Sequence, residues 1–184
     1  DVDGDGDGQV EIVPNAGDYE QRIQLLNPDN GEFAPQPALD TRLSERHSVD
    51  VIGVDDASGK YYILTDLFSD KADVRLYDTR TQKFDAEPVV ADQNFSIGGL
   101  VFGSQPSNFN QVLGFVIDGP AREVVYVDPT LKALQAGMRQ AFPGQQVSIS
   151  RYNADFSRVL FSTESAAQPP AYHLLVDGKR VVNL

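Results

Sequence analysis

A strand-and-turn pattern recurs along this chain about every fifty residues. The segment IQLLNPDNGEF at residues 23–33 has apolar residues at its first, third and fourth positions, and a polar turn that ends on phenylalanine follows. VRLYDTRTQKF at residues 74–84 has the same pattern and starts 51 residues later. A third copy, VVYVDPTLKAL from Val124, follows at an offset of 50 residues, and a fourth, weaker copy, YHLLVDGKRVV from Tyr172, follows at an offset of 48. A regular period of this length indicates a chain built from similar consecutive units.

Each copy follows other short segments with strand character. These segments alternate or run apolar, are rich in Val, Ile, Tyr and Phe, and are separated by Asp-Gly, Ser-Gly and Asn/Asp-Pro pairs. With a variable fourth segment near residues 86–91, each repeat supplies four strands. Four antiparallel strands per repeat of this length are typical of a β-propeller blade. A β-sandwich with coincidental spacing is the alternative.

We therefore predict an all-β fold, a partial β-propeller of about three to four blades with four antiparallel strands each. Residues 1–184 are expected to form a single domain, with repeats at about 8–40, 45–91, 95–142 and 147–184. Because a partial propeller leaves blade edges open, and open strand edges pair with other chains, we expect self-association through these edges.

One segment departs from the strand pattern and predicts an inserted α-helix near residues 129–142. Asp128 suits the N-cap and Pro129 the first helical position, where no backbone donor is needed. Apolar residues recur on one helical face, at Leu131, Leu134, Met138, Ala141 and Phe142. Pro143 and Gly144 end the helix. We expect the apolar face to pack on the edge of the blade rather than to bind a partner.

Composition narrows the range of partners. The formal charge is −12, with 27 acidic against 15 basic residues, so the chain repels phosphate backbones and we expect no nucleic-acid partner. The longest apolar runs, such as residues 124–127, are far shorter than the ~20 residues that cross a bilayer, so we expect no membrane partner. Cysteine is absent, which excludes disulfides and thiolate metal sites and leaves the compartment open.

The second half of the chain resembles the N-terminal propeller of bacterial peptidases of the prolyl oligopeptidase family. The resemblance lies in the helix that ends in FPG at residues 142–144, in the segment VSISRYNADFSRVLFSTES from Val147, and in PPAYHLLVD from Pro169. It extends from about residue 45 to the end and concerns blade architecture. The family implies a Ser-Asp-His triad on a separate α/β-hydrolase domain, with a G-x-S-x-G motif at the nucleophile.

No catalytic residue of that family can be assigned in this sequence. It contains no G-x-S-x-G, and its two histidines are His47, in the polar loop SERHS, and His173, in a strand-like run. A cluster of Ser44, His47 and Asp50 is conceivable, but a polar loop of this composition is ordinary. We expect the chain not to be an enzyme by itself, whereas its full-length parent would be a serine peptidase.

The resemblance favours a non-catalytic propeller segment that restricts substrate access to the hydrolase domain. The implied partners are the chain's own hydrolase domain, missing here, and the peptide substrates of the parent. The alternative is a stand-alone, calcium-stabilised β-propeller that serves as a binding or adhesion-like module and resembles FG-GAP repeats.

The acidic N-terminal stretch DVDGDGDGQVEIV is the basis of that alternative. Counted from the second aspartate, acids fall at calcium-loop positions one, three, five and nine, glycine at six, and a backbone carbonyl donor at seven. The candidate ligands are Asp3, Asp5, Asp7, Gln9 and Glu11. Because Pro14 replaces the bidentate acid at position twelve, we expect weak Ca²⁺ binding; the other reading is a metal-free acidic turn. Calcium binding would favour a periplasmic or extracellular location.

Overall fold

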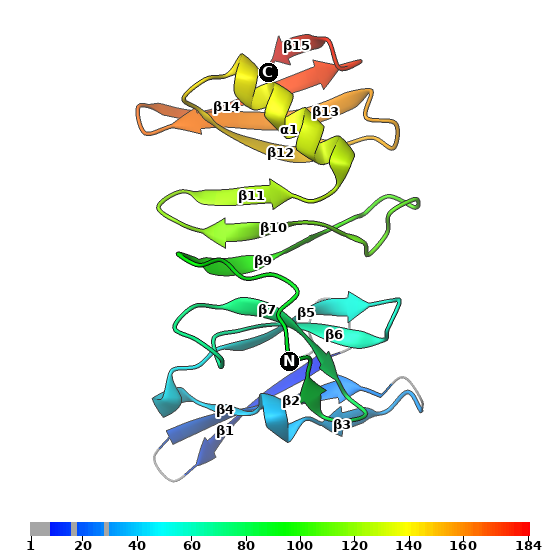
Figure 1. The fold of residues 1–184 in the computed structure, drawn as a ribbon, viewed down its shortest axis with the longest axis vertical. Helices are drawn as coiled ribbons and strands as arrows, with labels where there is room; N and C mark the ends of the chain where they lie inside the picture. The colour runs from blue at the N-terminus through cyan, green and yellow to red at the C-terminus, as the bar shows by residue number, and fades with distance from the viewer. Residues whose placement is uncertain (1–7, 16–17, 28–29) are drawn as a thin grey trace. The chain divides into compact units, whose positions relative to one another are not determined.

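The computed structural model describes residues 8–15, 18–27 and 30–184 (Figure 1). These residues form four antiparallel sheets of three or four strands and one α-helix, so the all-β prediction is confirmed. The chain divides into two compact units. The first comprises Asp1–Gly99 with Ile117–Gly119, and the second comprises Leu100–Val116 with Pro120–Leu184. No helix of the described residues is long and apolar enough to span a membrane.

The first sheet lies in the first unit and is built around β2. Its strands are β1 (Gly8–Asn15), β2 (Asp18–Leu26), β3 (Phe33–Pro35) and β4 (Thr41–Arg42). Strand β2 pairs with β1 along its length, with β3 at one end and with β4 at the other. Two 3-10 turns, η1 (Pro37–Leu39) and η2 (Leu43–Glu45), flank β4. Alternation along β2 buries Ile23 and Leu25 on one face.

The second sheet has the order β5-β6-β7-β8. Its strands are β5 (Val49–Asp55), β6 (Lys60–Thr65), β7 (Asp73–Asp78) and β8 (Lys83–Phe84). The fourth strand therefore precedes the expected segment at residues 86–91, of which only Val90 forms a bridge, with Val74. Val89 and Val90 still exchange backbone hydrogen bonds with Val74, whereas Pro88 has no N–H to donate to the ladder.

The core of the first unit joins these two sheets. Its buried members come from β2, η1, β5, β6 and β7: Ile23, Leu25, Leu39, Val49, Tyr61, Ile63 and Tyr77. Both tyrosines keep a hydroxyl partner inside the core. The Oη of Tyr61 donates to the carbonyl of Leu26 at 2.9 Å, and the Oη of Tyr77 donates to Gln36 Oε1 at 2.9 Å. Buried hydroxyls need such partners because losing hydration without a hydrogen bond is costly.

The third sheet has three strands in the order β11-β10-β9. They are β9 (Ser96–Phe102), β10 (Val112–Asp118) and β11 (Arg122–Tyr126). Gly114 in β10 is required by close packing, because a Cβ there would lie 2.6 Å from the carbonyl oxygen of Val125. Where the other repeats continue into a fourth strand, this one continues into the helix.

Helix α1 (Pro129–Ala141) confirms the predicted helix and its N-cap, since the Asp128 carboxylate accepts a hydrogen bond from the Leu131 amide at 2.8 Å. Leu131 packs with Leu113 and Tyr126, and Met138 packs against the fourth sheet. Gln135 is buried between them and donates to the carbonyl of Val124 at 2.9 Å. The apolar face therefore packs within the chain as expected, although Ala141 is exposed.

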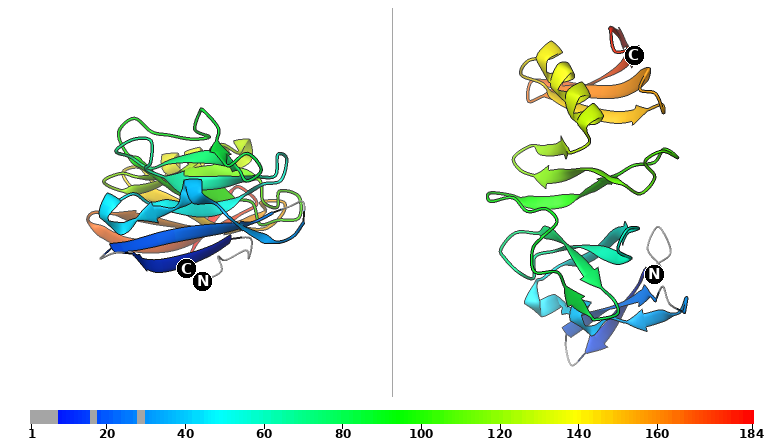
Figure 2. Two further views of the ribbon diagram at one scale, coloured as in Figure 1. Left: turned by 90° about the horizontal axis from the view of Figure 1, so that it is seen from below. Right: turned by 45° about the vertical axis from the view of Figure 1, so that its right-hand side comes forward.

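The fourth sheet follows the helix in the order β12-β13-β14-β15. Its strands are β12 (Gln146–Tyr152), β13 (Arg158–Ser165), β14 (Gln168–Val176) and β15 (Arg180–Asn183). Figures 1 and 2 show α1 beside this sheet. Its core contains Met138, Val147, Val159, Phe161 and Leu175, against which Leu134 and Phe142 of the helix region pack.

Candidate functional site

The predicted calcium ligands fall largely outside the described residues. Asp3, Asp5 and Asp7 are not among them. Gln9 and Glu11 lie in β1, where they face Gln24 and Arg22 of β2 across the antiparallel pair, and Glu11 is exposed. Over residues 8–15, 18–27 and 30–184, no three His, Cys, Asp or Glu side chains gather in a way that could hold a metal ion. Calcium binding stays a prediction.

The structure gives Ser44, His47 and Asp50 different partners. Ser44 Oγ donates to a carboxylate oxygen of Asp18, and His47 Nδ1 lies 3.4 Å from Asp66 Oδ1. Asp50 belongs to β5 and faces Leu64 of β6. The three residues therefore do not form a nucleophile, a base and an orienting acid.

A different polar cluster, which sequence reasoning did not identify, lies in the fourth sheet. His173 is only 6% exposed, and its Nε2 lies 2.9 Å from Thr163 Oγ1 while its Nδ1 lies 2.9 Å from Asn183 Oδ1. Because the Asn183 oxygen can only accept, Nδ1 donates to it, and Nε2 shares its hydrogen bond with the threonine hydroxyl. The signal in the sequence is a histidine on the inward-facing side of an alternating strand; its partners are ten residues away on either side.

Two phenylalanines enclose the imidazole. The ring of Phe161 stacks on it at a centroid distance of 4.9 Å, and the ring of Phe142 lies 4.8 Å away. Phe161 comes from β13 directly opposite His173, whereas Phe142 is the C-cap residue of α1. The histidine thus links three neighbouring strands to the end of the helix.

The order hydroxyl, imidazole, amide resembles a hydrolytic triad, but access and geometry argue for a structural role. Nucleophilic attack requires the substrate carbon within about 3–3.5 Å of the hydroxyl oxygen. Thr163 is 2% exposed, so a substrate carbonyl has no route to its Oγ1. Both ring nitrogens of His173 are already engaged. The cluster satisfies buried polar groups and fixes the register of β13, β14 and β15.

An apolar groove lies next to this cluster, between α1 and strands β13 to β15. It has a volume of about 750 Å³ and is lined mainly by side chains of the helix and the sheet, among them Leu134, Met138, Phe142, Phe161, Leu175 and Val181. Lys179 is the single titratable residue among those that line it. Such a lining suits contact with apolar groups and offers no acid–base pair for chemistry.

Comparison with known proteins adds no relative: no family model, no curated protein and no solved structure matches this chain. Its function is therefore inferred from its repeats, its sheets and its side chains.

Proposed function

We propose that this chain is a non-catalytic β-propeller segment of a serine peptidase of the prolyl oligopeptidase type. In this role it restricts the access of substrates to a separate α/β-hydrolase domain. One observation carries the proposal. Each of the four sheets is built from consecutive antiparallel strands of one stretch of sequence, ending at residues 42, 84, 126 and 183, and a propeller blade is a sheet of this kind.

The polar chemistry of the chain is consistent with a scaffold. The hydroxyl of Thr163, its most triad-like nucleophile, is enclosed by the sheet and occupied by His173. Of the residues that carry the family resemblance, Phe142, Val147, Val159, Phe161 and Leu175 belong to or pack against the core of the fourth sheet. Bond cleavage would then take place in the hydrolase domain, and this chain would restrict which substrates reach it.

The mechanism is steric. A ring of blades over an active site admits extended peptides and holds back folded proteins, which are too wide to enter. Enclosure also keeps bulk water from the reaction, which strengthens the electrostatic interactions of the active site. The partners are the hydrolase domain of the same protein and the peptides that it cleaves.

The test starts with the reading frame on both sides of this segment, in which we expect a G-x-S-x-G motif downstream. The full-length protein is then compared with a form that lacks residues 1–184, using dipeptide esters and a folded protein as substrates. The form without the segment should cleave the folded protein substrate, which the full-length protein leaves intact. Both forms should cleave the dipeptide esters.

A fluorophosphonate probe supplies the second readout. It should label the full-length protein at the motif serine and leave the 184-residue chain unlabelled. Stoichiometric labelling of the isolated chain, or a reading frame without a hydrolase domain, would contradict the proposal.

A further inference from the structure

Residues 30–32 lead into β3 and contain an asparagine-glycine pair, Asn30 and Gly31. Both residues are exposed, and so is Glu32. Two backbone hydrogen bonds close the hairpin here: the Asn27 amide donates to the Glu32 carbonyl at 2.8 Å, and the Gly31 amide donates to the Asn27 carbonyl at 2.8 Å. Gly31 has φ 72°, a conformation that residues with a Cβ rarely adopt. The backbone therefore requires glycine directly after Asn30.

Glycine in this position makes the Asn30 side chain chemically reactive. The backbone nitrogen that follows an asparagine can attack the carbon of its carboxamide and close a five-membered ring. A side chain on the following residue hinders that approach, and glycine has none. Asn30 is the only asparagine in the sequence that glycine follows. Because asparagine is among the thermolabile residues of proteins, this carboxamide is the one expected to react first.

The contacts of the Asn30 carboxamide favour its cleavage. The Glu32 amide donates to Asn30 Oδ1 at 3.0 Å, and Asn30 Nδ2 donates to Glu32 Oε2 at 3.4 Å. An N–H aimed at a carbonyl oxygen stabilises the negative charge that develops there during attack. A carboxylate beside the departing nitrogen favours the protonated form of that nitrogen. The two ends of the carboxamide thus face the groups that its loss of ammonia requires.

One hydrogen bond opposes the reaction. The Gly31 amide donates to the Asn27 carbonyl, and its nitrogen can attack only after this bond has opened. Residues 30–32 are exposed, so the opening involves no core side chain. Hydrogen bonds of exposed turns open locally at a small fraction of the free energy of global unfolding. The folded chain can therefore react without unfolding.

We propose that Asn30 is a site of spontaneous covalent modification, at which the Asn30-Gly31 pair forms a succinimide and then aspartate or isoaspartate. The Gly31 nitrogen bonds to Asn30 Cγ and gives up its proton. The Cγ–Nδ2 bond breaks, and Nδ2 leaves with that proton as ammonia. One water molecule then opens the ring, at Cγ to give aspartate or at the backbone carbonyl carbon to give isoaspartate. This modification is independent of the role proposed for the chain.

The modification has a structural consequence for the first unit. Both products add one negative charge, whereas isoaspartate also inserts a methylene group into the backbone between the hydrogen-bonded ends at Asn27 and Glu32. The hairpin that it lengthens pairs Leu25 of β2 with Ala34 of β3, and Leu25 is fully buried in the core. Isoaspartate at residue 30 should therefore loosen β3 and lower the stability of the first unit.

Prolonged incubation of the folded 184-residue chain at neutral pH and physiological temperature tests the proposal. Peptide mapping by mass spectrometry should find the exchange of an amide NH₂ for a hydroxyl at residue 30. Methylation of the same peptide by a protein isoaspartate methyltransferase should then identify isoaspartate.

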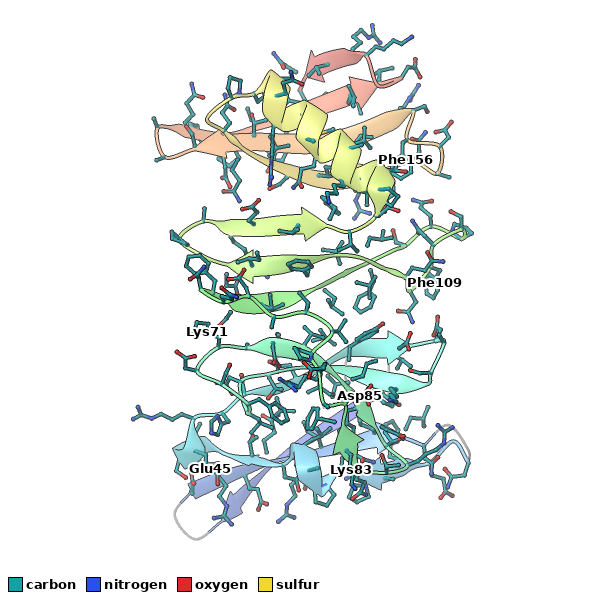
Figure 3. The ribbon with its side chains drawn as sticks, in the orientation of Figure 1. Glu45, Lys71, Lys83, Asp85, Phe109 and Phe156 are labelled. Carbon is teal, nitrogen blue, oxygen red and sulfur yellow. The ribbon has the colours of Figure 1, made fainter. Side chains whose placement is uncertain are left out.

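Other asparagines of the chain serve as internal controls. Asn153 is exposed, and its Oδ1 accepts from the Arg158 amide at 2.8 Å, but Ala154 follows it. Asn108 precedes Phe109, which Figure 3 labels on the loop before β10. Both asparagines should remain intact in the samples in which residue 30 is converted, because a side chain on the next residue hinders ring closure.

Two variants should lose the isoaspartate signal over the period in which the wild type acquires it. Gly31→Ala places a methyl group beside the attacking nitrogen. Because alanine is strained at φ 72°, Asn30→Gln is the second variant, which keeps Gly31 but would have to close a larger ring. A third variant, Asn30→Asp, carries the added charge without the added methylene. It should keep the melting temperature of fresh wild type, as exposed substitutions usually do, while the isoaspartate fraction melts lower.

The proposal is overturned if residue 30 stays intact, if Asn108 or Asn153 converts as fast, or if Gly31→Ala forms isoaspartate at the wild-type rate. An isoaspartate fraction that melts with Asn30→Asp would overturn the coupling to the fold.

Discussion

Tyr77 shows how a single buried polar side chain can be stabilising and sensitive to pH. It is fully buried, and its hydroxyl donates to Gln36, which is itself only 2% exposed. Burial, with smaller contributions from Asp40 and Asp78, raises the pKa of Tyr77 from 10 to about 12. Burial raises the pKa of Tyr126 in the second unit to about 12 as well. Both tyrosines are thus held neutral where exposed tyrosines ionise.

This shift predicts a loss of stability at alkaline pH. The unfolded chain ionises Tyr77 near pH 10, whereas the folded chain ionises it only near pH 12, so the free energy of unfolding falls as the pH rises through this interval. In urea unfolding, Tyr77→Phe should remove about 1.4 kcal/mol per pH unit from that slope. Tyr172→Phe, at a tyrosine that is 55% exposed, is the control and should leave the slope unchanged. Equal slopes in all three proteins would refute the assignment.

Thr163 provides a second test at the level of one atom. Thr163→Val keeps the shape of the side chain and removes the hydroxyl that is hydrogen-bonded to His173 Nε2, which leaves a buried ring nitrogen without a partner. We expect a loss of about 1–3 kcal/mol in the free energy of unfolding. Thr163→Ser retains the hydroxyl and should keep the hydrogen bond. Denaturant unfolding curves measure the free energy of unfolding of both variants and of the wild type. A valine variant as stable as the wild type would show that this hydrogen bond does not stabilise the fold.

Among the elements, α1 depends on a local signal at its start. The Asp128 carboxylate accepts from the Leu131 amide, one of the backbone donors that the first turn leaves without an intrahelical acceptor. Asp128→Ala should lower the free energy of unfolding by about 1 kcal/mol, and Asp128→Asn, which still caps, by much less. Thermal unfolding followed by circular dichroism measures both, and an alanine variant with wild-type stability would exclude a role for the cap.

For the whole molecule, the proposed incomplete propeller predicts self-association. β15 is an edge strand of its sheet, and its Val181 is 41% exposed. Unpaired edges recruit strands of other chains, whereas a lysine on an edge opposes pairing. Light scattering should therefore find a dimer that Val181→Lys shifts toward monomer. A wild-type chain that is monomeric at every concentration would contradict this expectation.

Calcium is the second prediction at this scale. If Asp3, Asp5 and Asp7 bind Ca²⁺ with Gln9 and Glu11, millimolar calcium should raise the melting temperature, because a ligand of the native state stabilises it. Magnesium at the same concentration should not, since it prefers a smaller octahedral site. The double variant with Asp5→Ala and Asp7→Ala is the control and should lose the effect. A calcium-independent melting temperature for the wild type would leave the metal-free acidic turn as the correct reading.

The strands and the helix were predictable because their signals are local. Alternation, turn pairs such as Ser58-Gly59, and the cap at Asp128 act within a few residues, and the structure has strands and helix where these signals lie. The fourth strand of the second repeat is expected near residues 86–91, but the structure pairs Lys83–Phe84 with β7 as β8 and leaves a single bridge between Val74 and Val90. The segment's apolar character did not reveal this.

The side-chain cluster around His173 could not be predicted in the same way. Thr163, His173 and Asn183 meet only because three strands align in one register, with a shift in the pairing of β13 and β14 after Thr163. Sequence alone determined the all-β class and the boundaries of most elements, because these follow from short-range preferences. Tertiary structure decided which polar groups are buried together, because register and burial depend on residues far apart in the chain.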